Sequence, residues 1–275
     1  MINQAYNELY PAHTSSADYI KKLIRLGAII LDHSIRTDTS GSIRLPASFN
    51  DLFGLRTSYS ITSRQGIIPS YNEFNTVGTL HRSLKDAKHL TAATLDVPDS
   101  SQFPKHLLYP LDFFPQADAD QQAMTESFIA IVERFLGIER TPVSITNTWA
   151  SNPPDEAQGR SLQEFLEMSA VWPMYYDTYH TFDTFRADYL AKFGKEAFVG
   201  PYMRKRWSIA VPFTKEERAQ GVAEMKIFRT WFETNIMGQH SDTVTDAIMV
   251  MPFGSASPKY RDDSNKYALG PHPCL

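Results

Sequence analysis

Residues 38–42 combine the residue types that an acyl-transfer site needs. Small residues at Ser40, Gly41 and Ser42 allow successive backbone N–H groups to point into one concavity, the arrangement that binds an anion. Such donors stabilise the oxygen that becomes negative in a tetrahedral intermediate, and Ser42 supplies a nucleophile when a base takes its proton. The same residues also fit an ordinary Ser/Gly turn between two strands.

Two oppositely charged residues flank this segment. Asp38 precedes the small residues and Arg44 follows them. We expect the two side chains to pair and hold the loop rigid, because a charge-assisted contact over this short separation fixes both ends of the turn. Pro46 comes two residues after Arg44, and it predicts a stop directly behind the loop.

Further motifs follow the serine segment in a fixed order. The chain reads FGLRTSY at 53–59, SRQGIIP at 63–69, NTVGTL at 75–80 and RSLKDA at 82–87. The order and spacing resemble the amidase signature family, in which a serine loop is followed by three strands and a helix with these motifs. The resemblance is strong over 16–95 and looser beyond, where 185–189 and 213–232 resemble a region of fungal members.

The resemblance implies a mechanism and assigns residues to it. The family hydrolyses carboxamide C–N bonds with a Ser–Ser–Lys triad and uses no metal or cofactor. By motif position Ser42 is the nucleophile and Asp38 and Arg44 support its loop. The oxyanion hole would consist of the N–H groups of four consecutive residues: Thr39, Ser40, Gly41 and Ser42. A small-molecule amide is the expected partner.

The rest of the triad departs from the family pattern. Only residues 32–37 separate a predicted strand at 28–31 from Asp38, and six residues span about 20 Å at most, too few to form the family's middle-serine loop. Residues 1–15 contain no lysine, and Lys21 and Lys22 fit the solvated face of a helix. We also expect the family's C-terminal part to be missing. A splice form, a pseudoenzyme and a gene-model artefact all fit this shortening.

Other chemistries find less support. His33 lies nine residues before Ser42 and is an alternative base, although no carboxylate partner is identifiable to orient it. The histidines include no His-x-x-x-His pair beside a glutamate, so the sequence predicts no zinc site. It contains no P-loop and no Gly-x-Gly-x-x-Gly turn after a strand, which argues against nucleotide binding.

Composition narrows the class of protein. The net charge of −4 gives no reason to expect a nucleic-acid partner, whose phosphates require a basic surface. The single cysteine, Cys274, fits a reducing compartment, and we expect a cytoplasmic protein without a membrane span, since no apolar run approaches about 20 residues. The sequence leaves the oligomeric state open.

Alternation of helices and strands predicts an α/β fold, a mixed central sheet covered by helices. We expect one amidase-like domain over 1–275, with an α/β core at 16–149, a helical aromatic-rich insertion at 150–238, and a final strand and tail at 239–275. Predicted helices are 16–26, with Ser15 as its cap, 83–95, 118–136, 161–172, 175–193 and 214–237. Predicted strands after the serine loop include 106–111, 143–148 and 246–251.

Two apolar patterns within these helices carry specific expectations. In the helix at 118–136 one set of side chains should face inward: Met124, Phe128, Ile131, Val132 and Phe135. An aromatic stripe at 175–189 fits either core packing against the sheet, which we favour, or an acyl-binding pocket. The basic run at 204–207 fits a solvated loop.

Three hypotheses for function remain. The first is an amidase-type serine hydrolase whose turnover is weak or lost because its triad is incomplete. The second is a catalytically inactive amidase-like protein that binds a small acyl or aromatic ligand, or a protein partner. The third is a non-functional shortened product.

Overall fold

The computed structural model describes residues 4–11, 14–27, 35–67, 71–95, 103–238 and 246–252. The predicted strand at 28–31, His33 and Cys274 lie outside these residues. The chain forms two compact units. Of the described residues, the first unit contains those up to 95 and those from 171 to 219, and the second contains 103–170, 220–238 and 246–252.

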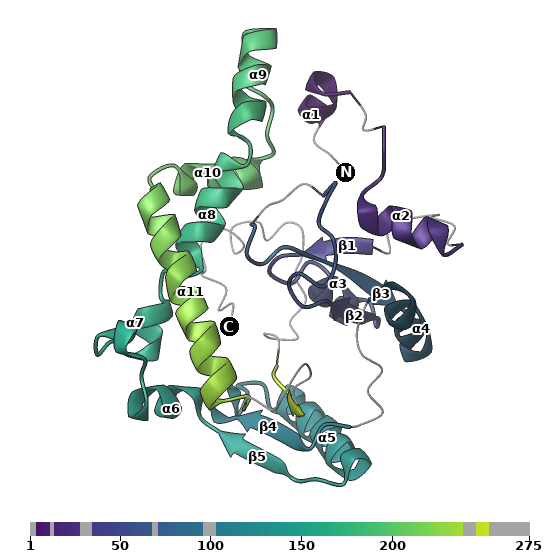
Figure 1. Cartoon of the computed structure of the whole chain (residues 1–275), viewed down its shortest axis with the longest axis vertical. Coiled ribbons are helices and arrows are strands. Elements are labelled where there is room, and N and C mark those ends of the chain that lie inside the picture. Colours follow the sequence, from purple (N-terminus) through teal and green to yellow (C-terminus); the bar gives the residue numbers. More distant parts are fainter. Residues whose placement is uncertain are drawn as a thin grey trace. The chain divides into compact units, whose positions relative to one another are not determined.

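A three-stranded antiparallel sheet forms the centre of the first unit (Figure 1). Its strands are β1 (Ile35–Asp38), β2 (Phe53–Arg56) and β3 (Thr76–His81), with β3 between the other two. A Cβ atom at Gly78 on β3 would lie 2.2 Å from the Leu55 carbonyl oxygen and 2.6 Å from Ile43 Cδ1. Only glycine therefore lets β3, β2 and the serine loop approach this closely.

Short helices complete this part of the first unit. They are α2 (Asp18–Arg25), α3 (Arg44–Phe49), which packs on β2, and α4 (Leu84–Thr94), which packs on β3. Contrary to the predicted stop, Pro46 lies inside the first turn of α3. The first turn tolerates proline because its N–H groups have no intrahelical acceptor. Ser83 caps α4 as predicted, accepting the Asp86 N–H at 3.1 Å.

The remaining helices of the first unit come from the start of the chain and from its segment Val171–Ala219. These are α1 (Gln4–Leu9), α8 (Val171–His180), α9 (Asp183–Phe193) and α10 (Pro201–Ala210). Phe185 and Tyr189 of α9 are buried, as predicted for the aromatic stripe, but they pack against helix α1 and not against the sheet. The basic run at 204–207 lies in helix α10 and not in a loop.

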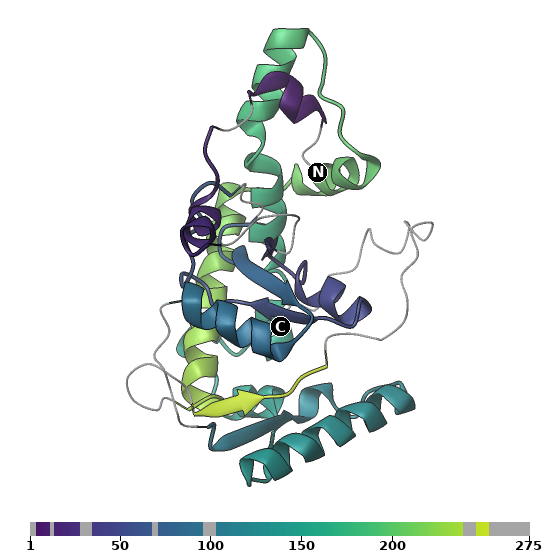
Figure 2. The ribbon, with the colours of Figure 1, turned by 90° about the vertical axis from the view of Figure 1, so that its right-hand side faces the viewer.

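A three-stranded parallel sheet forms the centre of the second unit (Figure 2). β4 (His106–Pro110) lies between β5 (Arg140–Val143) and β6 (Ala247–Met249). The helices are α5 (Ala119–Leu136), α6 (Ile145–Ser151), α7 (Leu162–Leu166) and the part of α11 (Lys215–Asn235) from Gln220 onward, with 3-10 turns at Leu111–Phe113 and Asp155–Ala157. Their core includes Leu108, Trp149, Phe165 and Trp231.

The predicted strand at 143–148 is wrong beyond residue 143. The Ser144 hydroxyl accepts the Asn147 N–H at 3.2 Å, and the Asp112 carboxylate accepts the Ile145 N–H at 2.6 Å. Both contacts cap a helix N-terminus, so the chain turns into α6. Asp112 lies on a different segment, and for this reason the local sequence did not indicate the helix.

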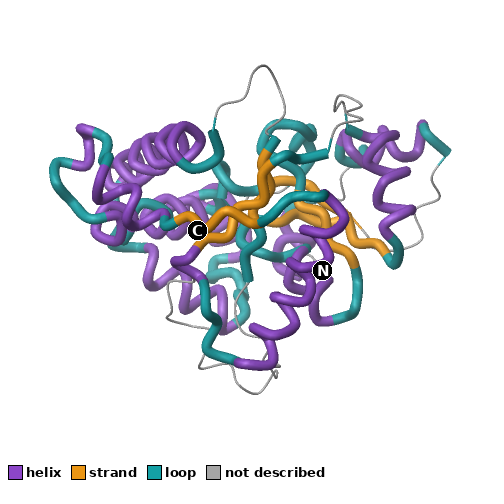
Figure 3. The backbone as a smooth tube through the Cα atoms, turned by 90° about the horizontal axis from the view of Figure 1, so that it is seen from below, coloured by secondary structure: helices purple, strands orange, loops and turns teal. Residues whose placement is uncertain are grey.

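The mixed α/β class is confirmed, although the described strands form two sheets and not one central sheet (Figure 3). α5 has nearly the predicted bounds, with Asp118 as its N-cap and left-handed Gly137 as its C-cap. Its orientation differs from the prediction. Ile129 is buried, whereas four of the five residues expected to face inward are exposed: Met124, Phe128, Ile131 and Phe135.

Candidate functional site

The serine loop connects β1 to α3 and winds around one buried carboxylate. Asp38, the last residue of β1, is fully buried and accepts the backbone N–H groups of Gly41 at 2.7 Å and of Ile43 and Arg44 at 3.3 Å. Gly41 has φ of 125°, a conformation that favours glycine. A strand-end aspartate and a glycine three residues later therefore define the path of the loop.

Two arginines neutralise Asp38. Arg44 donates from Nε at 3.0 Å and from Nη2 at 3.1 Å, which confirms the predicted pair. Arg56 of β2 places its Nε 3.6 Å from the carboxylate and donates from Nη2 to the Phe74 carbonyl at 2.7 Å. The loop is thus tied both to its own helix, α3, and to β2 on the far side of β3.

The pKa of Asp38 reflects a balance of these contacts. Burial by itself would raise the pKa, but the hydrogen bonds from Arg44 and Gly41 and the charge of Arg44 lower it below its ordinary value. For Arg56, burial and the nearby charge of Arg44 lower the guanidinium pKa against the opposing effect of Asp38. The lowered pKa favours the ionised form of Asp38, which is the form that the hydrogen bonds from Arg44 and Gly41 require.

Ser42 is presented to solvent by this arrangement. Its neighbours Gly41 and Ile43 are buried, with Ile43 fully inaccessible, while Ser42 itself is exposed. Within the described part of the chain, no side chain forms a hydrogen bond with the Ser42 hydroxyl. Lys21 pairs instead with Asp18 of its own helix at 3.4 Å. The structure thus brings the predicted nucleophile to the surface without assigning it a base.

The four predicted oxyanion donors differ in their surroundings. The Gly41 N–H donates to the Asp38 carboxylate, so it points into the loop and away from an incoming substrate. For the N–H groups of Ser40 and Ser42, the described residues provide no acceptor. The Thr39 hydroxyl donates to Asn75 Oδ1 at 3.2 Å. The prediction of an oxyanion hole now depends mainly on Ser40 and Ser42, and Gly41 acts through the shape of the loop.

A turn at 71–75 links the serine loop to the helical part of the same unit. Asn75 accepts from Thr39, and the Asn72 N–H donates to Asp177 of α8 at 3.5 Å. Asp177 is held by Arg218 of α11 through contacts of 2.8 and 3.1 Å, and Arg218 also contacts Glu73 at 3.0 Å. Sequence reasoning missed this network because the contacts that join residues 72 and 73 to Asp177 and Arg218 span 105 and 145 positions.

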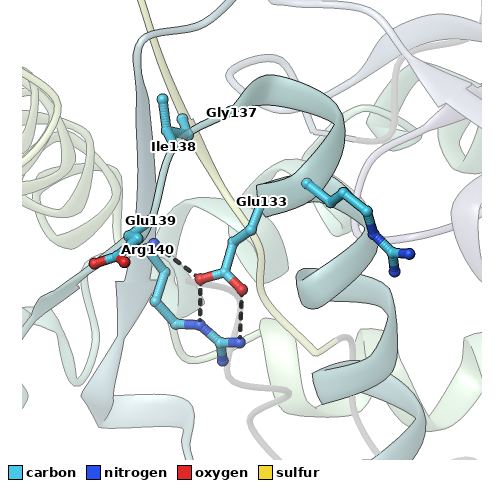
Figure 4. Close-up of a pocket in the computed structure, with 6 residues that line it drawn as sticks. Glu133, Gly137, Ile138, Glu139 and Arg140 are labelled. Atoms are coloured by element: carbon cyan, nitrogen blue, oxygen red, sulfur yellow. Dashed lines mark hydrogen bonds and ion pairs between the residues drawn. The ribbon is translucent and has the colours of Figure 1, made fainter.

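The second unit has an open hollow that is not an evident binding site (Figure 4). It is lined by Glu133, Arg134, Gly137, Ile138, Glu139 and Arg140. Arg140 makes ion pairs with Glu133 and Glu126, and its hydrogen bond to Glu133 is the largest cause that raises its pKa. This arginine therefore ties β5 to α5 and is already neutralised.

The described residues contain neither a metal-binding cluster nor a membrane-spanning helix. They contain no cluster of three histidine, cysteine, aspartate or glutamate side chains able to hold a metal ion. None of their helices has both the length and the apolar character that a membrane span requires.

Comparison with known proteins defines the class to which this fold and loop belong. A solved amidase superposes with a TM-score of 0.57 at 22% identity, covering 74% of this chain and 42% of that one. A Kluyveromyces lactis allophanate hydrolase gives a TM-score of 0.51 at 18% identity, covering 74% and 33%. The fold is therefore that of the amidase-signature proteins.

Sequence comparison gives a match to one family. Residues 23–148, just under half of the chain, match the amidase family. Amidase 1 of Oryza sativa subsp. japonica is 32% identical over 109 residues, which cover 39% of this chain and 25% of that protein. Amidase 1 of Arabidopsis thaliana is 30% identical over 115 residues, covering 42% and 27%. The matches thus span about a quarter of these relatives.

Proposed function

We propose that this chain is a serine hydrolase of the amidase signature type that cleaves the C–N bond of a small carboxamide. The observation that carries the proposal is the exposed Ser42 hydroxyl in a loop organised by buried Asp38. The Ser42 oxygen bonds to the carbonyl carbon as its proton passes to solvent water, and the Ser40 and Ser42 N–H groups donate to the developing oxyanion. When the oxyanion collapses, the C–N bond breaks and the amine leaves with a proton from water. A water molecule then attacks the acyl-enzyme, which releases the acid and restores the Ser42 hydroxyl.

We further propose that turnover is slow. A neutral serine is a weak nucleophile without a base in hydrogen-bond reach, and no described side chain occupies that position at Ser42. The interval of six residues before Asp38 also supports the absence of the family's middle serine. On the composition, the protein is cytoplasmic and needs neither a cofactor nor a nucleic-acid partner.

Labelling with a fluorophosphonate tests the nucleophile. The natively folded chain is incubated with the probe and the adduct is mapped by mass spectrometry. We expect slow modification of Ser42 that disappears in Ser42→Ala. Ser48→Ala is the matched control, since Ser48 is also exposed, lies in α3 and donates to the Leu45 carbonyl at 2.8 Å. Folded protein that shows no adduct at Ser42 overturns the hydrolase proposal.

The alternative is an inactive amidase-like protein that binds a small acyl or aromatic ligand, or a protein partner. The unpartnered Ser42 hydroxyl favours it, because an intact loop without a base can still bind an amide without cleaving it. Ligand-observed NMR with benzamide and hexanamide separates the two functions. Binding without product or adduct supports the alternative, and binding followed by acid formation supports the hydrolase.

A further inference from the structure

The exposed side of α5 carries an apolar row that the second unit contacts at one end, where the Phe135 ring meets the Phe103 ring edge to face with centroids 5.1 Å apart. Met124, Phe128, Ile131 and Phe135 are 65%, 54%, 56% and 68% exposed, respectively. Their spacing of four, three and four residues places them on one side of the helix, as in the contact seam of a coiled coil. Soluble proteins seldom expose such a contiguous row unless another surface covers it. We call this row the α5 seam.

Two charged residues mark the ends of the α5 seam. Asp120 lies in the first turn of α5 and Arg134 in the last turn. Both are exposed, and neither has a hydrogen bond or ion pair with any residue in the described part of the chain. They are fourteen positions apart, or about 21 Å along the helix, so they cannot pair with each other. Each is thus available to a partner of opposite charge.

We propose that the α5 seam is a homodimer interface in which two copies of α5 pack antiparallel about a two-fold axis at Ser127. An isologous contact requires a self-complementary surface. With the axis at Ser127, Asp120 of one copy lies opposite Arg134 of the second copy, and the reverse contact is formed at the other end. Both unpartnered charges are satisfied by one symmetry operation.

The same axis matches side-chain sizes along the seam. It sets three of the four seam residues opposite alanines of the second copy: Ile131 opposite Ala123, Met124 opposite Ala130 and Phe135 opposite Ala119. The fourth, Phe128, lies opposite Glu126. The three alanines are exposed on α5, and so is Ser127 on the axis. Large residues facing small ones allow two helices to interdigitate closely. The sequence of one helix therefore contains both the projections and the recesses.

The size of the seam sets the expected strength of the dimer. From 119 to 135 it is about 24 Å long, and a single helix pair of this length buries less area than a standard stable interface. We expect a concentration-dependent dimer with dissociation in the micromolar range. Added salt weakens it because the two end contacts are exposed ion pairs.

Sedimentation equilibrium of the full chain over a wide concentration range tests the dimer. Ile131→Glu should give a monomer at every concentration. Asp120→Arg or Arg134→Asp alone should raise the dissociation constant about tenfold or more, because each places like charges at both ends. The control is Arg229→Asp, which changes an exposed arginine of α11 outside the seam and should leave association unchanged.

Mixing the two single charge variants is the decisive experiment. In a mixed dimer of Asp120→Arg with Arg134→Asp, each end again joins opposite charges, so association should return. Circular dichroism confirms that each variant is folded. A chain that stays monomeric overturns the proposal and means that the same molecule covers the seam. A dimer insensitive to Ile131→Glu, or no recovery on mixing, also overturns it.

Discussion

At the scale of single residues, the serine loop depends on Asp38 more than on the serine it presents. One carboxylate organises three backbone N–H groups and two guanidinium groups. These contacts hold the buried anion, whose desolvation would otherwise be costly. Ser42 makes no comparable contact, so its substitution should alter chemistry and leave the fold intact.

Asp38→Asn should lower the free energy of unfolding by about 3 kcal/mol, because it leaves two partly buried arginines without their anion. Urea denaturation measures the loss. Asp51→Asn is the matched control: Asp51 is exposed with φ of 52°, which asparagine tolerates, and we expect a change below about 0.5 kcal/mol. Equal effects at both positions would contradict the role of Asp38.

The lowered pKa of Asp38 predicts a pH dependence. A carboxyl group with a lower pKa in the folded state stabilises the protein above its unfolded pKa of about 3.9, and this contribution is lost as pH falls through the folded pKa. The stability difference between wild type and Asp38→Asn should therefore be full near pH 7 and shrink below pH of about 4. Urea midpoints measured across this range check it, and a constant difference would argue against ionised Asp38.

At the scale of elements, the turn at 71–75 connects the serine loop with α8 and α11. Arg218 binds Asp177, which is buried, and Glu73. Arg218→Met should cost about 3 kcal/mol, since it leaves a buried carboxylate unpaired, and it should speed amide exchange at 71–75 and in the serine loop. Arg229→Met, on the exposed side of the same helix, should cost about 0.5 kcal/mol. Unchanged exchange at 71–75 in Arg218→Met would contradict the link.

The elements also show how far the sequence could predict the fold. Local capping signals predicted α4 and α5 because Ser83, Asp118 and Gly137 act on their own helices. The start of α6 escaped prediction because Asp112 supplies one of its caps from another segment.

The predicted orientation of α5 failed for a different reason. The helix has two apolar rows, and periodicity shows that such rows exist without showing which one meets the sheet. The row with Ile129 is buried, and the α5 seam is exposed. In the same way, the sequence indicated the pairing of Asp38 with Arg44 but not the contribution of Arg56, which comes from another strand.

At the scale of the whole molecule, each compact unit has its own sheet and its own core. Gly78→Ala should therefore act mainly on the first unit. The added Cβ meets the Leu55 carbonyl, and we expect a loss of about 3 kcal/mol with faster amide exchange in β1 to β3. Exchange in β4 and α5 should not change. Gly200→Ala, where the added Cβ has no neighbour within 4 Å, is the control. Equally faster exchange in both units would contradict independent cores.

The most direct test of the central claim is amide turnover by wild type and Ser42→Ala, measured side by side as ammonia release from small carboxamides. The account predicts slow release by wild type at a rate clearly above that of Ser42→Ala, which should match the buffer. Release that is equal in the two proteins, or absent from folded wild type, would contradict the assignment of Ser42 as the nucleophile of an amidase.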